Sequence, residues 1–278
     1  MVKEKEKVML IIGEKLNSTR EKVREMIERR DSELIKDLAI RQVEGGADIL
    51  DVNSSAASGN PEENIEWLVS TVQEAVAVPL CIDSPNVEEI EKGLATHNWD
   101  MGRALINSIT GEKEKLDRLL PIIKRYKCAV VALVMDEHGI PDNAKTRIEI
   151  AHKLIKILTD SGVPLSDIYI DPLVIPIGTN DKNGLITMET IKGVKEIYPE
   201  VKTIIGLSNI SYGLPERKLI NQIFMVLAMS CGLDAAIIDP IDKRMMAVIK
   251  TSCALLGKDS FCREYIQAYR EGKLTFEK

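Results

Sequence analysis

The sequence predicts a single α/β domain, a (β/α)₈ TIM barrel over residues 1–278, on three observations. Short apolar runs rich in Val, Ile and Leu alternate with helix-like segments, as expected of a parallel sheet with crossover helices. Eight such runs occur, and eight βα repeats close a barrel. The chain has 278 residues, 45% of them hydrophobic, and no Pro-, Gly- or Ser-rich linker divides it, so one large core is expected.

The expected strands recur roughly 25 to 40 residues apart, the spacing of βα units. Because helices cover both faces of a parallel sheet, each strand reads as a nearly continuous apolar run. The eight predicted strands are residues 8–16, 47–53, 79–83, 103–108, 129–136, 168–173, 202–208 and 235–239.

The clearest helix signal follows the second strand. Asn60 is expected to cap the helix, with Pro61 at its first position and Glu63 at its third. The apolar residues that follow fall on one helical face; they are Ile65, Leu68, Val69, Val72 and Val76. Residues 146–160 repeat the same pattern and predict a second amphipathic helix.

Three other segments predict a kinked or divided helix, a loop and an interface between subunits. Helix 112–125 is expected to be kinked or divided, because Pro121 removes a backbone hydrogen bond. Residues 177–186 are polar and contain two glycines, which indicates a loop, either a mobile lid or an ordinary surface loop. Residues 219–229 are apolar on more than one face, which predicts a homodimer interface.

Charge and hydropathy exclude two classes of partner. The net charge of −6 lacks the excess of Lys and Arg that binding a phosphate backbone requires, so no nucleic-acid partner is expected. Residues 1–7 form a mixed-charge run without a signal-peptide core, and no apolar run approaches membrane length. No membrane association is therefore expected.

The cysteines and histidines indicate a reduced protein without a metal site. The five cysteines show no CxxC spacing and lie mostly in apolar runs, which predicts reduced core thiols and a cytoplasmic location. None of the three histidines lies two to five residues from a cysteine or another histidine, so no zinc site is expected. These residues are Cys81, Cys128, Cys231, Cys253, Cys262, His97, His138 and His152.

Polar residues end the predicted strands. In a (β/α)₈ barrel such residues meet at the C-terminal mouth, where catalytic and binding groups gather. The strand-end residues are Glu14, Asn17, Asp51, Asn53, Asp83, Asn107, Asp136, Asp171, Ser208, Asn209 and Asp239. The alternative is that acidic and amide side chains merely bond their own backbone where strands become loops, which would suffice for Asp136 and Asp239.

A mouth of this composition favours an uncharged heterocycle. It carries Asp, Asn, Glu and Ser but almost no Lys, Arg or His, which does not suit a phosphate ester. A pterin fits, because one carboxylate accepts two hydrogen bonds from its 2-amino and N3–H edge, while an amide serves the other ring atoms.

Seven segments in order along residues 9–262 resemble one family. They are MLIIGE at 9–14, EGGADILDVN at 44–53, LCIDS at 80–84, ALINS at 104–108, YIDPL at 169–173, GLSNIS at 206–211 and CGLDAA at 231–236. The sequence thus resembles the pterin-binding methyltransferases, which include methyltetrahydrofolate:corrinoid/iron–sulfur protein methyltransferases and the folate module of cobalamin-dependent methionine synthase.

The resemblance implies a methyltransferase of the EC 2.1.1 class. It would move a methyl group between N5 of 5-methyltetrahydrofolate or tetrahydrofolate and the cobalt of a cobalamin (corrinoid) carried by a partner protein. By the same resemblance, Asp83, Asn107 and Asp171 hold the pterin, with Asp171 on the 2-amino and N3–H edge. Asn209 would lie near N5 and act as the catalytic hydrogen-bonding residue, with the proton arriving through water.

The remaining expected folate-binding residues have weaker support. Gly206 and Ser208 would let the ring approach the backbone, although a glycine there also suits tight packing. Glu14 completes the expected set, and Asp51 and Asn53 would form the pocket floor or bond each other beneath it. A further residue, Arg217, matches a family position near the folate tail or is simply solvated.

Three rim loops depart from the family pattern, at residues 54–59, 136–138 and 212–215. The identity of the corrinoid protein, the direction of transfer and the pathway stay open; acetyl synthesis, O-demethylation and methylated-amine breakdown all remain. Alternatives are a dihydropteroate synthase-like enzyme, a non-catalytic folate-binding or corrinoid-chaperoning subunit, and a barrel of other chemistry. A dihydropteroate synthase-like enzyme would need cations for a leaving pyrophosphate, and the sequence has no Arg in the loop after the second strand and no Ser-x-Arg motif at the last strand.

Overall fold

The computed structural model describes residues 9–274 and has the predicted TIM-barrel fold. Eight parallel strands close a barrel in chain order, with β1 pairing with both β2 and β8. The strands are β1 (Leu10–Asn17), β2 (Ile49–Asn53), β3 (Leu80–Asp83), β4 (Leu105–Ile109), β5 (Ala129–Leu133), β6 (Ile168–Asp171), β7 (Lys202–Gly206) and β8 (Ala235–Ile238).

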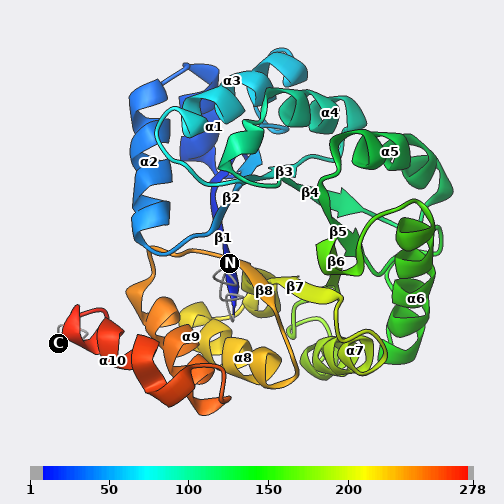
Figure 1. Ribbon diagram of the computed structural model, residues 1–278, viewed down its shortest axis with the longest axis vertical. Helices are drawn as coiled ribbons and strands as arrows, with labels where there is room; N and C mark the ends of the chain where they lie inside the picture. Colours follow the sequence, from blue (N-terminus) through cyan, green and yellow to red (C-terminus); the bar gives the residue numbers. More distant parts are fainter. Residues whose placement is uncertain (1–8, 275–278) are drawn as a thin grey trace, which may run out of the picture.

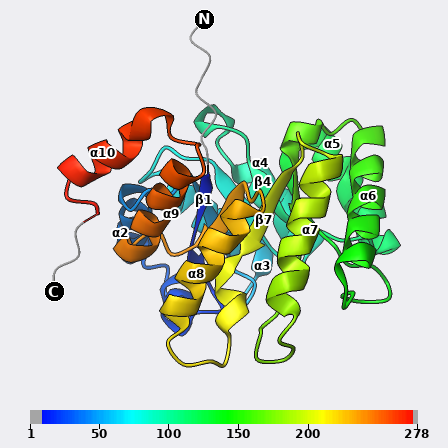
Figure 2. The same ribbon diagram turned by 90° about the horizontal axis from the view of Figure 1, so that it is seen from below.

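The helices follow one another in chain order around the strands (Figure 1). They are α1 (Glu21–Glu28), α2 (Ser32–Glu44), α3 (Pro61–Gln73), α4 (Val87–Thr96), α5 (Lys113–Tyr126), α6 (Ala144–Asp160), α7 (Asn183–Ile197), α8 (Arg217–Ser230), α9 (Lys243–Leu255) and α10 (Arg263–Arg270). Four short 3₁₀ turns lie between them in the described chain, at Trp99–Met101, Leu165–Asp167, Leu207–Ser211 and Ser260–Cys262. Helix α10 lies outside the ring, beside α9 (Figure 2).

Side chains alternate between two apolar layers along each strand. One layer fills the barrel interior and includes Ile12, Ile49, Cys81, Leu105 and Val131. The other layer packs between the strands and the surrounding helices. Because the period along a strand is two, the residue two positions beyond an interior residue also faces inward, now nearer the mouth.

A bulge in β1 changes this register. Gly13 pairs with Leu50 but Leu16 pairs with Val52, so β1 carries one extra residue between these pairs. The buried Gln42 of α2 accepts a hydrogen bond from the Lys15 backbone N–H at 2.9 Å, which satisfies a donor in the bulge.

Several predicted strands end earlier than expected. Strand β5 ends at Leu133, and Asp136 lies beyond it in an isolated bridge with Gly139, so the fifth strand has no polar end residue. Strand β6 ends at Asp171, because the chain turns at Leu173, where φ is 63°. The prediction that every strand ends in a polar residue is therefore wrong at β5, and at β7 and β8 the polar residues also lie just beyond the strand.

The seventh and eighth strands are also shorter. Ser208 and Asn209 lie in the 3₁₀ turn Leu207–Ser211, just after β7, and Asp239 follows β8. The predicted first strand starts at Val8, which lies outside the described residues, as does the charged run 1–7.

The helix predictions are confirmed for two segments, α5 is continuous rather than divided, and the predicted loop 177–186 extends four residues too far. Asn60 caps α3 through its side chain, with Pro61 in the first turn, and α6 contains the predicted 146–160 helix. Helix α5 is not divided at Pro121 but runs on to Tyr126, because the apolar face containing Leu116, Leu119, Ile122 and Ile123 stays buried on both sides of the proline. Helix α7 begins at Asn183, inside the predicted loop 177–186.

The cysteines differ in burial. Cys81 and Cys128 are buried as predicted, whereas Cys262 is exposed, and all five cysteines are free. Within residues 9–274, no helix has both the length and the apolar character needed to cross a membrane.

We expect Asn60→Ala to lower the free energy of unfolding by about 1 kcal/mol, because the Asn60 Oδ1 atom accepts from the Glu62 and Glu63 backbone N–H groups. Chemical denaturation checks this change. Asn60→Asp keeps the acceptor and should leave stability within a few tenths of a kcal/mol of the parent. Equal stability of all three proteins would contradict the capping role.

Candidate functional site

Asp83, at the end of β3, is the centre of the first polar group at the barrel mouth. Its Oδ2 atom accepts hydrogen bonds from Asn53 Nδ2 at 3.0 Å and from Asn17 Nδ2 at 3.3 Å. The Oδ1 atom of Asn53 accepts from Ser18 Oγ at 2.9 Å, which orients the Asn53 amide. Burial raises the pKa of Asp83, while these amide donors and Lys115 lower it. Amide side chains from β1 and β2 therefore bond to one carboxylate at the end of β3.

Asp51 and Asn107 form a second group. The Asn107 Nδ2 atom donates to Asp51 Oδ1 at 3.3 Å, and Asn107 is the register partner of Asp83 on the neighbouring strand. Asp51 and Asn53 do not bond each other, because successive inward positions of β2 reach different neighbours. Burial, and then the nearby Asp83 carboxylate, raise the pKa of Asp51 well above its ordinary value, which favours its neutral form.

Glu14 links β1 to the turn after β7. Its Oε2 atom accepts from Ser208 Oγ at 3.4 Å, and its Oε1 atom is 2.6 Å from Arg20 Nη2. Burial raises the pKa of Glu14, and Arg20 opposes this effect. The adjacent Lys15 lies 2.5 Å from the Asp239 carboxylate.

Asp171 stands apart from these groups. Its Oδ1 atom accepts from the Leu173 backbone N–H at 2.8 Å. Its Oδ2 atom accepts no hydrogen bond from any residue in 9–274, so this oxygen is available to a ligand donor. Burial raises the pKa of Asp171 to about 6, against the opposing effects of the Leu173 N–H and Arg147.

Asn209 lies in the turn after β7. Its side chain is exposed, and its amide makes no hydrogen bond within the described part of the chain. A Cβ atom at Gly206 would lie 3.4 Å from Asn209 Nδ2, so a larger residue there would crowd the amide. The absent side chain at Gly206 therefore leaves room for the Asn209 amide.

Arg217 braces this turn. Its Nη2 atom donates to the Ser208 carbonyl at 2.7 Å and its Nε atom to Ser211 Oγ at 3.1 Å, while its guanidinium lies 5.9 Å from the centre of the Tyr212 ring. Arg217 is exposed to solvent and also contacts three residues of this turn, so its guanidinium is held beside the turn after β7.

The structure links most of the predicted site residues directly. Hydrogen bonds join Asn53 to Asp83, Asp51 to Asn107, and Glu14 to Ser208. The side chains of Asp171 and Asn209 make no hydrogen bond to any of them within residues 9–274.

Two residues of the mouth are not among the predicted site residues. One is Asn17, a strand-end residue that the β1 bulge brings to Asp83. The half-buried Lys115 of α5 lies close enough to Asp83 to lower its pKa, and no sequence signal marks it.

The expectation of almost no cations at the mouth is wrong. Lys15, Arg20, Lys115 and Arg217 all lie near its acids or turns, because the β1 bulge and the first turns of helices bring them there. Two of them, Lys15 and Arg20, form ion pairs with Asp239 and Glu14. Within residues 9–274, no group of three or more His, Cys, Asp or Glu side chains is arranged to hold a metal ion.

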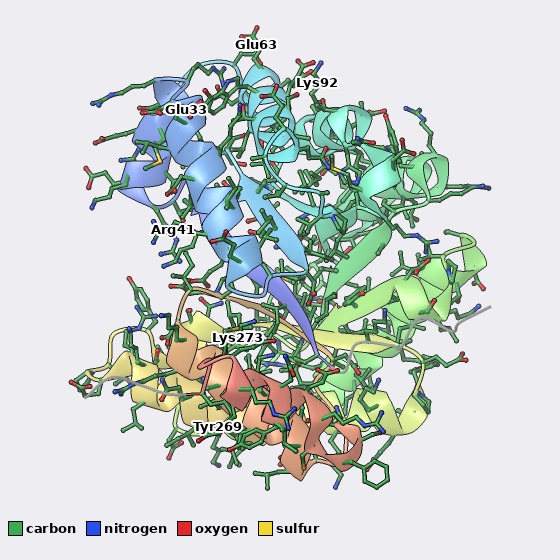
Figure 3. The ribbon with its side chains drawn as sticks, turned by 60° about the vertical axis from the view of Figure 1, so that its left-hand side comes forward. Glu33, Arg41, Glu63, Lys92, Tyr269 and Lys273 are labelled. Carbon is green, nitrogen blue, oxygen red and sulfur yellow. The ribbon has the colours of Figure 1, made fainter. Side chains whose placement is uncertain are left out.

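A cavity of about 490 Å³ lies away from the mouth, between α2, α9 and α10. Arg41 of α2 and Lys273, after α10, line it and are labelled in Figure 3. None of the predicted site residues lines this cavity. Four basic and four acidic side chains border it, so its charge favours neither anions nor cations.

The family follows from comparison of the whole sequence. The sequence profile described as "Pterin binding enzyme" matches residues 13–239, which span all eight strands except the first three residues of β1. The chain belongs to the pterin-binding enzyme family. The polar mouth described above lies within the matched residues of this pterin-binding chain.

Individual relatives add detail. A methylcorrinoid:tetrahydrofolate methyltransferase of Eubacterium limosum is 40% identical over 268 residues, covering 96% of this chain and 98% of that protein. The methionine synthase of Mycobacterium leprae (strain TN) is 32% identical over 243 residues, but these cover 83% of this chain and only 20% of that protein.

Solved structures agree on the fold. The dihydropteroate synthase from Xanthomonas albilineans in complex with 7,8-dihydropteroate has a TM-score of 0.62 at 18% identity, covering 91% of this chain and 93% of that chain. At this identity the likeness concerns the barrel alone.

We expect Asp171→Asn to stabilise this pterin-binding enzyme at pH 7.5. The folded-state pKa of about 6 lies above the ordinary aspartate value of 3.8, so ionisation opposes folding increasingly as pH rises from about 4 to about 6 and fully above that. Asparagine mimics the protonated form, and the gain should be on the order of 2 kcal/mol at pH 7.5 and vanish below about pH 4.

Denaturation curves from pH 3.5 to 8 measure this effect. The control Asp181→Asn changes an exposed aspartate and should leave the pH dependence unaltered. If Asp171→Asn is less stable than the parent at pH 7.5, or if its gain does not vary with pH, the ionised form of Asp171 does not destabilise the folded protein.

Proposed function

We propose that this protein is a methyltransferase of the EC 2.1.1 class that moves a methyl group between N5 of a tetrahydrofolate and the cobalt of a corrinoid on a partner protein. The observation that carries the proposal is the 40% identity, over nearly the full length of both chains, to a protein named for this reaction. The mouth geometry supports it, because its carboxylates and amides suit the ring of a pterin.

Asp171 is the proposed partner of the 2-amino and N3–H edge of the pterin. Its Oδ2 atom is not used by the protein, and its Oδ1 atom accepts a single backbone hydrogen bond, so the carboxylate retains the capacity for two donors. Asp83 and Asn107, side by side on β3 and β4, are proposed to bind the other ring atoms. Asn53 and Asp51 bond Asp83 and Asn107 and hold them in place, whereas Glu14 bonds Ser208 in the turn that carries Asn209.

Asn209 is proposed to act at N5. Demethylation of the folate requires positive charge on N5, because a tertiary amine is a poor leaving group; the reverse transfer requires an N5 lone pair aimed at the methyl carbon. The exposed amide of Asn209 has no side-chain hydrogen bond within residues 9–274. Its oxygen can accept a hydrogen bond from the N5–H of tetrahydrofolate and leave the lone pair free, and its N–H can donate to N5 of the methylated folate or to a water beside it. An amide is not a strong acid, so any proton passes through that water.

We further propose that the methyl group passes from the corrinoid to the folate, as the name of the Eubacterium limosum relative states for that protein. In this direction the cobalt–carbon bond breaks with its electron pair left on cobalt, the N5–carbon bond forms, and N5 releases its proton. A corrinoid methylated during O-demethylation would supply such a methyl group to one-carbon metabolism. The cytoplasm is the proposed location, since the five cysteines are free.

Stopped-flow mixing tests the function. The protein is mixed with 5-methyltetrahydrofolate and free Co(I) cobalamin, and in the reverse direction with methylcobalamin and tetrahydrofolate. The absorbance of methylcobalamin should rise in the first case and fall in the second. Folate binding without either change would favour a non-catalytic binder. Condensation of a pterin pyrophosphate with p-aminobenzoate would favour a dihydropteroate synthase.

We expect Asn209→Ala to lower the rate of methyl transfer roughly 100-fold while weakening folate binding far less, because the lost hydrogen bond acts mainly in the transition state. Single-turnover rates and calorimetric dissociation constants separate the two effects. Asn180→Ala, which changes another exposed asparagine near the mouth loops, serves as the control. Equal losses in rate and affinity would count against the role at N5.

A homodimer through α8 is also proposed. Leu219, Ile223, Val226 and Leu227 are 58%, 55%, 39% and 44% exposed, an unusual apolar surface for a helix that already buries Phe224 and Met225. Light scattering at micromolar concentration should give twice the chain mass of 31.0 kDa. Ile223→Glu should give the chain mass itself, with Leu255→Glu, an exposed leucine on α9, as control. A parent protein at 31.0 kDa would refute the dimer.

A further inference from the structure

Arg147 occupies an unfavourable position for a cation. Its side chain is 1% exposed and lies in the first turns of α6, where the positive end of the helix dipole repels a positive charge. No carboxylate lies within 4.0 Å of its guanidinium in the described part of the chain. Burying a guanidinium without a contacting anion lowers the stability of the folded protein, which indicates that Arg147 has a specific role at this position.

The Arg147 guanidinium donates hydrogen bonds to the backbone immediately after Asp171. Its Nη1 atom donates to the carbonyls of Pro172 and Leu173, each at 2.7 Å, and its Nε atom donates to the Pro141 carbonyl at 2.9 Å. Leu173 has a φ of 63°, a conformation that costs free energy for a branched side chain. Arg147 therefore stabilises the turn in which the strand ends.

The same turn orients the Asp171 carboxylate. The Leu173 N–H donates to Asp171 Oδ1 at 2.8 Å, while the Leu173 carbonyl accepts from Arg147 and, at 3.4 Å, from Thr187 Oγ1. The Pro172 carbonyl, which belongs to the same peptide group as the Leu173 N–H, also accepts from Arg147, so this peptide connects the buried guanidinium to a carboxylate that Arg147 does not contact.

We propose that Arg147 is the positioning residue of Asp171, holding its carboxylate in orientation and in the ionised form that accepts two hydrogen bonds from a pterin edge. This inference rests on the proposed function, in which Asp171 binds that edge. Its charge acts through space and its hydrogen bonds act through the backbone of residues 172–173.

The charges around Asp171 fix the sign of the expected effect. Burial raises its pKa, whereas the Leu173 N–H and then Arg147 lower it; Asp142, in the loop before α6, acts on Arg147 in turn. Removing the cation therefore raises the pKa of Asp171 further. As the pH is lowered, the Asp171 carboxylate is then protonated earlier, so folate binding that needs the ionised form is lost at a higher pH than in the parent protein.

The test measures the dissociation constant of 5-methyltetrahydrofolate against pH for the whole protein, Arg147→Gln, Arg147→Lys and a control, Arg30→Gln. Arg30 also donates a guanidinium hydrogen bond, to Asn64 Oδ1 at 2.9 Å, but lies outside this turn. In Arg147→Gln, the pH midpoint of binding should rise by about one unit, so affinity at pH 6 falls roughly fivefold more than at pH 8. Arg30→Gln should leave the midpoint unchanged.

Arg147→Lys separates charge from geometry. It keeps the cation but cannot present the same fork to two carbonyls, so affinity should fall about equally at every pH with the midpoint unmoved. If Arg147→Gln fails to fold, this variant decides the question, because parent-like affinity at all pH values would overturn the inference. In an Asp171→Asn background, replacing Arg147 should add no pH-dependent effect.

A second readout does not depend on folate. The ¹³C signal of the Asp171 carboxyl, assigned by its loss in Asp171→Asn, should titrate at higher pH in Arg147→Gln than in the parent. An unchanged titration overturns the role of Arg147 even if folate binds. Absence of folate binding to the parent protein, with a shifted titration, overturns the proposed function and leaves the coupling of Arg147 to Asp171 intact.

Discussion

The alternation of side chains along eight closed parallel strands is the constraint on which the site depends. Inward positions carry apolar residues low in the barrel, such as Ile49, Cys81 and Leu105. Two residues later, the same faces carry Asp51, Asp83 and Asn107. The packing that excludes water from the core therefore also delivers hydrogen-bonding groups to the mouth, and a slip of one residue would turn each group outward.

Desolvation is the second constraint, because burial raises the pKa of Glu14, Asp51, Asp83 and Asp171 and so disfavours their ionised forms. Amides from neighbouring strands oppose this at Asp51 and Asp83, and the β1 bulge allows Asn17 to join them. Asp171 has one backbone donor and a more distant cation instead. A protein selected only for stability would replace such a group, so the arrangement is typical of a site kept for function.

The two sides of the barrel mouth differ in the burial and the hydrogen bonding of their side chains. On one side Asp51, which is buried, and Asp83, which is half-buried, are bonded to amides. On the other side, the turn after β7 exposes Asn209 and Tyr212 and is held by hydrogen bonds from Arg217. Under the proposed function, the first side binds the flat ring and the second faces the partner that carries the methyl group. A braced turn suits this role, because methyl transfer depends on a fixed line between donor and acceptor atoms.

Local sequence determined the barrel, the α3 cap at Asn60 and most of the residues at the mouth, because strand periodicity and capping are properties of a few neighbouring residues. Tertiary structure alone decided that β5 ends without a polar group, that α5 continues through Pro121, and that Asp51 bonds Asn107. It also decided the links of Arg147 to Asp171 and of Lys115 to Asp83. Such pairs lie tens of residues apart, and only the closing of the barrel sets their distances and their burial.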